Sequence, residues 1–347
     1  MTKTMKAVRL HGHGGLDQLR YEDAPVPQIG ADEVLIKVKA TALNHLDLWT
    51  IKGVPGLKLE FPHILGNDMA GVVEEVGELV EHVQPGDEVV VAPGRGCGHC
   101  AECAAGRDNL CSEYWLYGYQ LNGGFAQYAA VRADNLLPRP QQIDWPEAAS
   151  ASLVFLTAWH MLVGRAGLRP GETCLVMAAG SGVGIAAIQI AALLGARVIA
   201  AAGSDAKLEK AKSLGADSVV NYTDPEWPRR VRQLTGKRGV DVVVENTGED
   251  YFAGCVGALA KSGRLVTCGA TSGPMANFDI RLLFAKHLTL YGSYMSSKAE
   301  WHEVWRFLAT GKLKPVVDRT FPLAEAPAAL ERMQKREQFG KLVLIPE

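Results

Sequence analysis

Short segments in which hydrophobic and polar positions alternate dominate the first 150 residues of the chain. Val34–Ala40 reads VLIKVKA, Gly71–Val76 reads GVVEEV and Asp87–Ala92 reads DEVVVA. Turn signals such as Gln84-Pro85-Gly86-Asp87 separate them. Because alternation with a period of two is typical of half-buried strands, this part predicts an irregular antiparallel barrel or sandwich.

Near Trp145 the pattern changes to short apolar strands separated by helices. Pro146–Val163 is helical in pattern, with Pro146 suited to a first turn after Asp144. The predicted strands are Thr173–Met177, Arg197–Ala202, Ser218–Asn221, Val240–Glu245, Arg264–Gly269 and Leu288–Ser293. The predicted helices between them are Val183–Leu194, Asp205–Leu214, Pro225–Leu234 and Tyr251–Ala260. Six apolar strands alternating with helices predict an α/β fold with a doubly wound parallel sheet.

The sequence pattern of the C-terminal segment is again similar to that of the first part of the chain. It predicts helices over Trp301–Thr310 and Pro322–Met333 and a last strand over Lys341–Ile345. We therefore expect the chain to return to its first domain. The predicted domains are residues 1–154, containing a cysteine-rich lobe at 95–113, then 155–291, with 292–347 as the return segment.

The charge and composition of the chain exclude several classes of function. Thirty-six basic residues against 38 acidic ones give a formal net charge of −2, which excludes the basic field of a nucleic-acid or anionic-membrane binder. The N-terminal residues contain no apolar stretch of a secretory signal. The apolar runs, such as Ile185–Leu194, are too short to span a bilayer. A cytoplasmic protein with a small-molecule partner is the expectation.

A turn rich in small residues follows the first strand of the predicted parallel sheet. Thr173–Met177 runs into AAGSGVG at Ala178–Gly184 and then into an apolar helix. Small residues let the backbone approach a pyrophosphate, and a helix N-terminus offers free N–H groups and a positive dipole end. The strict G-x-G-x-x-G pattern is not met, because Ala179 and Ser181 stand at its first two positions. In this context the turn still predicts dinucleotide binding, with contacts from Gly180, Ser181, Gly182 and Val183.

The end of the second strand indicates which dinucleotide binds. An acidic residue there would accept hydrogen bonds from the ribose hydroxyls of NAD, but the strand ends in Ala202-Gly203-Ser204. Lys207 and Tyr222 follow nearby, which favours the 2′-phosphate of NADP(H). Asp205 is the argument for NAD(H), which stays open as an alternative.

Four of the seven cysteines are close together in the chain, at Cys97, Cys100, Cys103 and Cys111. Four thiolates at this spacing can surround one metal ion, and a closed four-sulfur site suits structural zinc. An iron–sulfur cluster is the chemical rival. Its common bacterial motif places the fourth cysteine after three residues and before a proline, whereas Cys111 follows after seven and precedes Ser112. We expect one structural Zn²⁺ that takes no part in the chemistry.

Taken together these features resemble the medium-chain dehydrogenase/reductase superfamily, which includes zinc alcohol dehydrogenases and NADPH:quinone oxidoreductases. The resemblance covers essentially the whole chain and implies a GroES-like catalytic domain and a Rossmann domain. The motifs that carry it include LGNDMAGVV at Leu65–Val73, PGDEV at Pro85–Val89, GGFAQY at Gly123–Tyr128 and TAW at Thr157–Trp159. The AAGSGVG turn and the set Gly203, Ser204, Lys207 and Tyr222 are closer to the quinone reductases, where the set contacts the 2′-phosphate.

The chain departs from zinc alcohol dehydrogenases where those enzymes hold catalytic zinc. By resemblance Asn44, Asn67 and about Leu153 stand at the three ligand positions, and Leu46 replaces the hydroxyl that relays the alcohol proton. Without a Lewis acid an alkoxide is hard to form. The Asn44-x-x-Asp47 motif looks instead like the metal-free quinone and enone reductases. A zinc site rebuilt from His45, His63 and Asp68 stays open as an alternative.

The leading hypothesis is an NADPH-dependent reductase that delivers hydride to a quinone or a polarised C=C bond. Two further hypotheses are an alcohol dehydrogenase or carbonyl reductase, and a non-catalytic NADP(H)-binding protein. The resemblance also implies a homodimer or homotetramer, for which the edge strand at Leu288–Ser293 is a candidate interface. Besides the residues already named, the expected site has catalytic Asn44, Asp47 and Thr157, cofactor contacts from His45, Thr247, Gly269 and Ala270, and pocket walls from Trp49, Trp115 and Trp159.

Overall fold

The computed structural model describes residues 3–347 and divides them into two units. The first unit runs to Leu153 and also includes Ser297–Ala309 and Lys314–Glu347, whereas the second comprises Val154–Ser296 and Thr310–Leu313. The main boundaries lie at 153/154 and 296/297, where the sequence predicted 154/155 and 291/292. The C-terminal segment belongs largely to the first unit.

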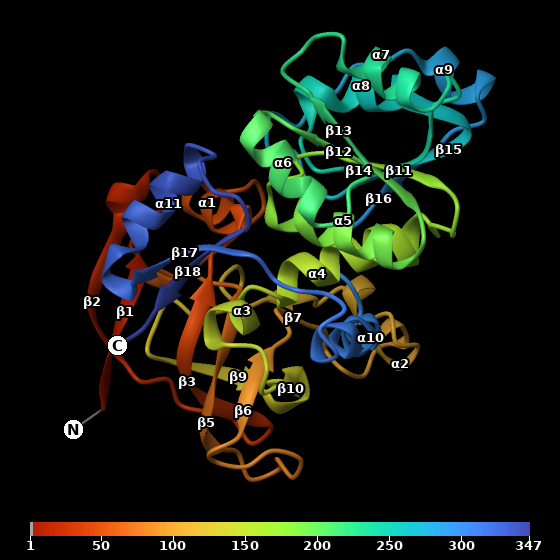
Figure 1. Ribbon diagram of the computed structural model, residues 1–347. Helices are drawn as coiled ribbons and strands as arrows, with labels where there is room; N and C mark the ends of the chain where they lie inside the picture. Colours follow the sequence, from red (N-terminus) through yellow and green to blue (C-terminus); the bar gives the residue numbers. More distant parts are fainter. Residues whose placement is uncertain (1–2) are drawn as a thin grey trace. The chain divides into compact units, whose positions relative to one another are not determined.

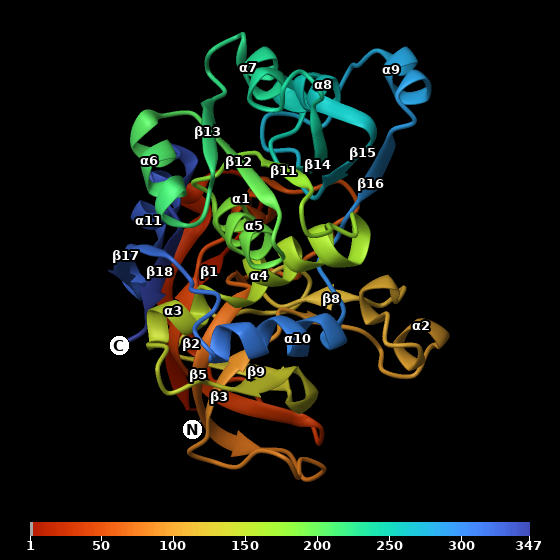
Figure 2. The ribbon, with the colours of Figure 1, turned by 45° about the vertical axis from the view of Figure 1, so that its right-hand side comes forward.

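The second unit is built on a six-stranded parallel sheet with the order β13-β12-β11-β14-β15-β16 (Figure 2). This order starts in the middle of the sheet and reverses direction once, as a doubly wound fold requires. The sequence-based expectation of an α/β class is confirmed. The strands are β11 (Thr173–Val176), β12 (Arg197–Ala202), β13 (Ser218–Asn221), β14 (Val240–Glu245), β15 (Leu259–Thr267) and β16 (Thr289–Gly292).

Helices cover both faces of this sheet. The helices α5 and α6 pack against β11, β12 and β13 on one side, and α7 and α8 lie on the other (Figure 1). The central strands read as continuous apolar runs because both of their faces are buried. The helices are α4 (Ser152–Trp159), α5 (Gly182–Leu193), α6 (Asp205–Ser213), α7 (Trp227–Leu234), α8 (Glu249–Ala258) and α9 (Ile280–Ala285).

The first unit contains a seven-stranded sheet of order β10-β6-β5-β3-β18-β17, with β9 also paired to β3, and a three-stranded sheet β2-β1-β4. Most pairs are antiparallel, as the alternating pattern predicted, but β17 and β18 run parallel. The long strand β3 pairs with β5, β9 and the C-terminal β18, so the return segment completes this sheet. The strands are β1 (Thr4–Leu10), β2 (Leu19–Pro25), β3 (Glu33–Ala42), β4 (His63–Ile64), β5 (Asp68–Val76), β6 (Glu88–Val91), β7 (Gly94–Arg95), β8 (Trp115–Leu116), β9 (Tyr128–Arg132), β10 (Leu136–Pro138), β17 (Val317–Pro322) and β18 (Lys341–Ile345).

Short helices connect the strands of the first unit. The predicted single helix Pro146–Val163 is wrong in its continuity: it is split into α3, α4 and a π-helical turn at His160–Arg165. The start is set as expected, because Asp144 accepts from the Glu147 N–H while Pro146 lies in the first turn. The helices are α1 (His45–Lys52), α2 (Ala101–Ala104), α3 (Trp145–Ala149), α10 (Lys298–Ala309) and α11 (Ala326–Gln334).

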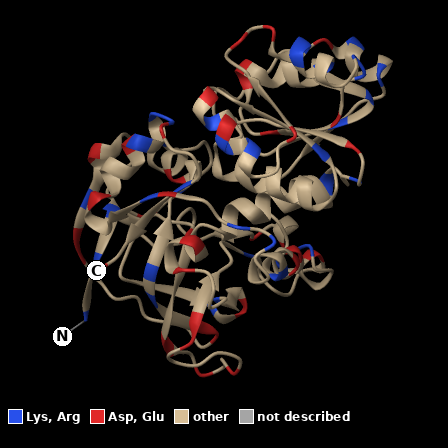
Figure 3. Cartoon of the chain, in the orientation of Figure 1, with Lys and Arg blue, Asp and Glu red and all other residues tan. Residues whose placement is uncertain are grey.

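Charged residues of both signs are interspersed along both units (Figure 3). This distribution agrees with the net charge of −2. Among residues 3–347, no helix combines the length and the apolar character needed to cross a bilayer.

Candidate functional site

A buried polar cluster lies at the start of α1, in the first unit. The Asn44 Nδ2 donates to Asp68 Oδ2 at 2.9 Å, and the Lys341 Nζ donates to Asn44 Oδ1 at 2.5 Å and to Asp68 Oδ2 at 3.0 Å. The Leu153 N–H donates to the other carboxylate oxygen at 2.8 Å. Asp68 is 0%, Lys341 4% and Asn44 6% exposed. We call Asn44, Asp68, Lys341 and the Leu153 N–H the Asp68 cluster.

The Asp68 cluster involves two of the three positions that the resemblance assigns to catalytic zinc ligands. Asn44 and Leu153 are both hydrogen-bonded to the Asp68 carboxylate. The third, Asn67, is turned to the Tyr117 carbonyl, to which its Nδ2 donates at 2.5 Å. The Asp68 carboxylate therefore accepts three hydrogen bonds, one of them from the Lys341 ammonium, and this donor set does not fit a further cation.

Asp47 holds the backbone beneath this cluster. Its carboxylate accepts from the Asn44 N–H at 2.7 Å and from the Gly66 N–H at 3.2 Å. Burial raises the pKa of Asp47 to about 7, although these two backbone hydrogen bonds and Lys341 oppose the shift. These hydrogen bonds fix the N-terminus of α1, where Asn44 lies. The geometry of Asp47, which was predicted to be catalytic, is therefore that of a residue that positions Asn44.

Two histidines of the first unit are held neutral. Burial lowers the pKa of His45 to about 4, with the positive charges of Arg336 and Lys341 adding to the effect. Burial likewise lowers the pKa of His63 to about 4, against a hydrogen bond from its ring to the Gly118 backbone carbonyl that raises it. The four-residue motif Asn44–Asp47 thus offers an amide and a neutral imidazole at the start of one helix.

The His63 shift predicts a pH-dependent stability. The unfolded histidine has an ordinary pKa of 6.5, so between pH 6.5 and 4 the unfolded state binds a proton that the folded state does not. The contribution is complete above pH 6.5 and is lost as the pH falls through 4, amounting to about 3 kcal/mol. The raised pKa of Asp47 acts in the opposite direction, so the histidine must be isolated by a variant.

Chemical unfolding of wild type and His63→Gln between pH 4 and 7 measures this contribution. We expect the difference in unfolding free energy between the two proteins to change by about 3 kcal/mol across the window. The matched control is His82→Gln, which replaces an exposed histidine of the same unit. Parallel curves for wild type and His63→Gln would contradict the assignment.

The four clustered cysteines come together as the spacing predicts. Their Sγ atoms all lie within 4.8 Å of one another. Backbone N–H groups of Cys97, Cys100, Cys103 and Glu113 donate to three of these sulfurs at 3.3–3.5 Å, which favours thiolates. A single tetrahedral ion with metal–sulfur bonds of about 2.3 Å separates its ligands by about 3.8 Å. The arrangement fits one such ion, whereas a multi-iron cluster would hold its thiolates further apart.

The AAGSGVG turn joins β11 to α5, as the sequence predicts. Ser181 caps the helix, because its Oγ accepts from the Gly184 N–H at 3.0 Å. A Cβ at Gly184 would lie 2.3 Å from the Ala178 carbonyl oxygen, so only glycine allows this close packing. Asn246, which follows β14, donates to the same Ser181 hydroxyl at 3.3 Å. Gly180, Gly182 and Val183 lie in the turn and in the first turn of the helix.

The predicted 2′-phosphate residues gather at the carboxyl ends of β12 and β13. Ser204 precedes α6, Lys207 lies in its first turn, and the Tyr222 ring is close enough to meet a Cβ built at Gly203 at 3.1 Å. Asp205, the argument for NAD(H), accepts at Oδ1 from the Asn221 Nδ2 at 3.3 Å. That contact turns the carboxylate toward β13.

A buried carboxylate that the sequence analysis missed organises the ends of β14 and β15. Glu245 accepts from the Thr247 and Gly248 N–H groups at 2.5 and 2.8 Å and from the Thr267 hydroxyl at 2.9 Å, and the Thr247 hydroxyl also donates to it. The Thr247 side chain is therefore committed to Glu245. The sequence signal that could have identified Glu245 is an acidic residue at the end of an apolar strand. Gly269 and Ala270 follow β15 at the same edge of the sheet.

The three tryptophans and Thr157 lie on different elements. Trp49 is on α1, where its ring packs edge-on against His45 with centroids 6.4 Å apart. Trp115 is on β8 beside the cysteine lobe and is 44% exposed. Thr157 and Trp159 are buried in α4 of the second unit. The role of the tryptophans as pocket walls and the catalytic role of Thr157 stay predictions.

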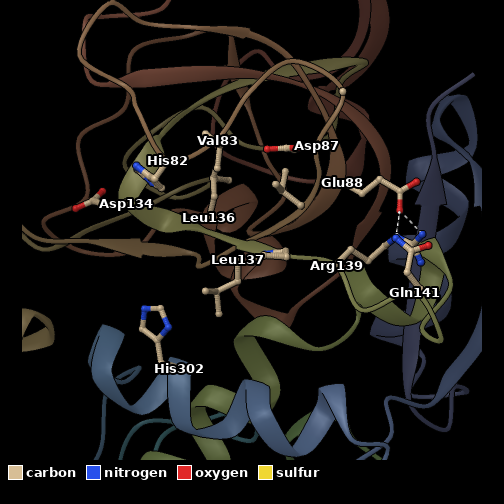
Figure 4. A pocket seen from close by; sticks show the side chains of 13 residues that line it. His82, Val83, Asp87, Glu88, Asp134, Leu136, Leu137, Arg139, Gln141 and His302 are labelled. Atoms are coloured by element: carbon tan, nitrogen blue, oxygen red, sulfur yellow. Dashed lines mark hydrogen bonds and ion pairs between the residues drawn. The ribbon is translucent and has the colours of Figure 1, made fainter.

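A separate cavity of 740 Å³ lies in the first unit (Figure 4). It is lined by His82 and Asp134 at one end and by Glu88 and Arg139 at the other. Arg139 pairs with Glu88, and Asp134 pairs with Lys298 at 2.6 Å. None of the residues lining it is among the predicted site residues.

Comparison with known proteins places the chain among oxidoreductases. An alcohol dehydrogenase GroES-like domain matches residues 30–141, and a zinc-binding dehydrogenase domain matches residues 182–310. The crotonyl-CoA reductase of Streptomyces collinus is 32% identical over 95% of this chain and 82% of its own length. A solved structure described as an NAD-dependent alcohol dehydrogenase is 49% identical, with a TM-score of 0.96, over 98% of this chain and 99% of that one. A 2-octenoyl-CoA carboxylase reductase in complex with NADP and 2-octenoyl-CoA is 30% identical, with a TM-score of 0.90, over 100% and 88%.

These matches confirm the resemblance found in the motifs. They agree on the GroES-like domain and the Rossmann-type parallel sheet, and they span nearly the whole chain. The chain therefore belongs to the medium-chain dehydrogenase/reductase superfamily, in its zinc-type alcohol dehydrogenase-like branch, and is an NAD(P)H-dependent oxidoreductase.

Proposed function

We propose that this protein is an NADPH-dependent reductase that transfers hydride to a quinone or to a C=C bond conjugated with an oxygen, without a catalytic metal. The observation that carries the proposal is the Asp68 cluster. The Asp68 carboxylate accepts hydrogen bonds from Asn44, Lys341 and the Leu153 N–H. By resemblance, Asn44 and Leu153 stand where zinc-dependent relatives would hold their metal. Polarisation of the acceptor must then come from hydrogen-bond donors.

Each part of the chain has a role in this reaction. The reduced nicotinamide cofactor supplies the hydride when it is bound. The turn at Gly180–Val183 and the N-terminus of α5 bind its pyrophosphate, and the neutral His45 donates an N–H to a cofactor phosphate. The Asn44 amide binds the acceptor oxygen, while Thr157 lies against the nicotinamide or the acceptor. Asp47 holds Asn44 through the backbone.

The preference for NADP(H) rests on Ser204, Lys207 and Tyr222. A hydroxyl, an ammonium and a phenol at the ends of β12 and β13 suit a 2′-phosphate, and the Asp205 carboxylate is engaged by Asn221. The NADP complex of the carboxylase reductase relative supports the same choice. We further propose that the cysteine lobe holds one structural zinc, with its four sulfurs leaving no position for a substrate.

Alcohol dehydrogenation is the second candidate, favoured by the relative that is 49% identical and described as an NAD-dependent alcohol dehydrogenase. His45 and His63 are neutral, as metal-binding histidines must be. A rebuilt zinc site would also need Asp68 to leave Lys341 and its two amide donors. That exchange would leave a buried ammonium unpaired, which is costly.

Steady-state assays distinguish the two reactions. We expect NADPH consumption with 1,4-benzoquinone, a 2-enal or an enoyl thioester, with little change after treatment with a chelator that spares the cysteine lobe. We expect no detectable NADP⁺ or NAD⁺ reduction with primary and secondary alcohols. Alcohol oxidation that is lost with a second equivalent of zinc would overturn the proposal in favour of the dehydrogenase.

The chain also offers a face for a second copy of itself. Among the described strands β16 pairs only with β15, so its other edge carries no further strand, although the Gly292 carbonyl accepts from Arg165 Nε at 3.0 Å. Nearby in sequence Met275, Ile280 and Phe284 are each at least 66% exposed. We propose a homo-oligomer in which two such edges pair about a two-fold axis.

A further inference from the structure

The Asp68 cluster contains a lysine that the reaction described above does not yet use. Lys341 is the first residue of β18, Asp68 is the first residue of β5, and Asn44 follows β3 (Figure 1). Because β3 pairs with both neighbours, with Ala42 opposite Asp68 and also opposite Val343, the three side chains converge from adjacent strands of one sheet. Their relative positions are therefore set by the sheet itself.

The two charges fix the orientation of the Asn44 amide. A carboxamide presents a carbonyl acceptor at one end and an NH₂ donor at the other. Here the Lys341 ammonium faces the Oδ1 and the Asp68 carboxylate faces the Nδ2. Turning the amide over would set NH₂ against an ammonium and a carbonyl against a carboxylate. Both contacts would be repulsive, and burial strengthens them.

With the amide fixed, the one donor that Asn44 has left for a ligand is its second Nδ2–H. Its other N–H is taken by Asp68 and its carbonyl by Lys341. The side chain therefore presents an N–H donor, while its carbonyl oxygen lies against the Lys341 ammonium. A donor stabilises an oxygen that gains negative charge and does nothing for one that must lose a proton.

We propose that Lys341 is a positioning residue that holds the Asn44 amide so that its free N–H binds the oxygen of the hydride acceptor. This inference rests on the proposed reductase function and deepens it. The substrate class is then an acceptor whose reacting C=C bond is conjugated with a carbonyl, thioester or quinone oxygen.

The chemistry balances with groups already named. Hydride from the reduced cofactor forms a C–H bond at the acceptor carbon and breaks the C=C π bond. The π electron pair moves to the conjugated oxygen, where the Asn44 N–H meets the charge. A proton from water then completes the reduced product, while the cofactor is oxidised.

A double-mutant cycle tests the proposal with NADPH and either 1,4-benzoquinone or a 2-enal. Asn44→Ala and Lys341→Met should each lower kcat by about 100-fold, the loss expected for one oxyanion donor, with the NADPH Kd unchanged within about twofold. The double variant should be little worse than either single one, because both changes remove the same oriented N–H. The matched control is Lys286→Met, whose Nζ instead donates to the carbonyls of Gly257 and Leu259 and whose kcat loss should be small.

Lys341→Met leaves Asp68 buried without a cation, which can unfold a protein. The variant Lys341→Met/Asp68→Asn removes both charges together and keeps the site neutral. It should fold and still lack kcat, since nothing then imposes the amide orientation. Recovery of kcat in that variant, or losses from Asn44→Ala and Lys341→Met that multiply, would overturn the positioning role. Wild-type protein that reduces neither acceptor but oxidises alcohols would instead overturn the proposed function.

Discussion

Replacing Cys103 by serine should abolish stoichiometric zinc binding and destabilise the first unit while leaving the chemistry intact. Loss of one of four thiolates opens the closed site, and we expect a stability loss of about 4 kcal/mol. The lobe also anchors α10, because the Lys298 N–H donates to the buried Asp108 carboxylate at 2.9 Å. Elemental mass spectrometry should give one zinc per chain in wild type and close to none in the variant.

The kcat of the folded Cys103→Ser protein decides between a structural and a chemical role. We expect it to stay within about twofold of wild type, because a closed four-sulfur site has no open position for substrate. The matched control is Cys174→Ala in β11, a buried cysteine outside the lobe, which should keep its zinc. A selective loss of kcat in folded Cys103→Ser, or two zinc ions in wild type, would contradict the assignment.

The second unit was predictable because its signals are local. Each of its six strands is an apolar run bounded by turns or helices, and β12, β13 and β14 have the predicted bounds. Less of the structure of the first unit could be predicted from the sequence. The strand β2 reads LRYEDAP and is largely exposed, so its pairing with β1 gives little hydrophobic signal. The helix α1 contains buried Asp47 and Thr50, which hide its amphipathic pattern.

The residues of the candidate site likewise fall into those that local sequence signals predict and those that depend on distant parts of the chain. Motif spacing located the cysteines and the glycine turn, because each of these lies within a short segment, whereas Asn44 was assigned through the resemblance and its role stays a prediction. Lys341 was not predicted as a site residue, because a lysine at the start of a C-terminal strand is usually exposed to solvent. Its burial depends on β18 lying between β3 and β17, almost 300 residues apart from Asn44 in sequence. Glu245 was missed for a related reason, because one of its hydrogen-bond donors, the Thr267 hydroxyl, comes from the next strand of the sheet.

Reversing the charge of Lys207 should convert the cofactor preference. With a glutamate at this position the 2′-phosphate, which carries close to two negative charges, would meet a carboxylate in the first turn of α6. We expect the KM for NADPH to rise by about 100-fold, equivalent to about 2.7 kcal/mol. The KM for NADH, which lacks this phosphate, should change by no more than about threefold.

A change in overall charge alone could also weaken NADPH binding, so the control must carry the same charge on the same helix. Lys212→Glu meets this condition, because Lys212 lies at the exposed C-terminal end of α6 and pairs with Glu209 at 2.7 Å. At ordinary ionic strength its charge is screened over a Debye length of about 10 Å, so both KM values should stay close to wild type. If Lys207→Glu raised the two KM values equally, the residue would not contact the 2′-phosphate, and Asp205 would again favour NAD(H).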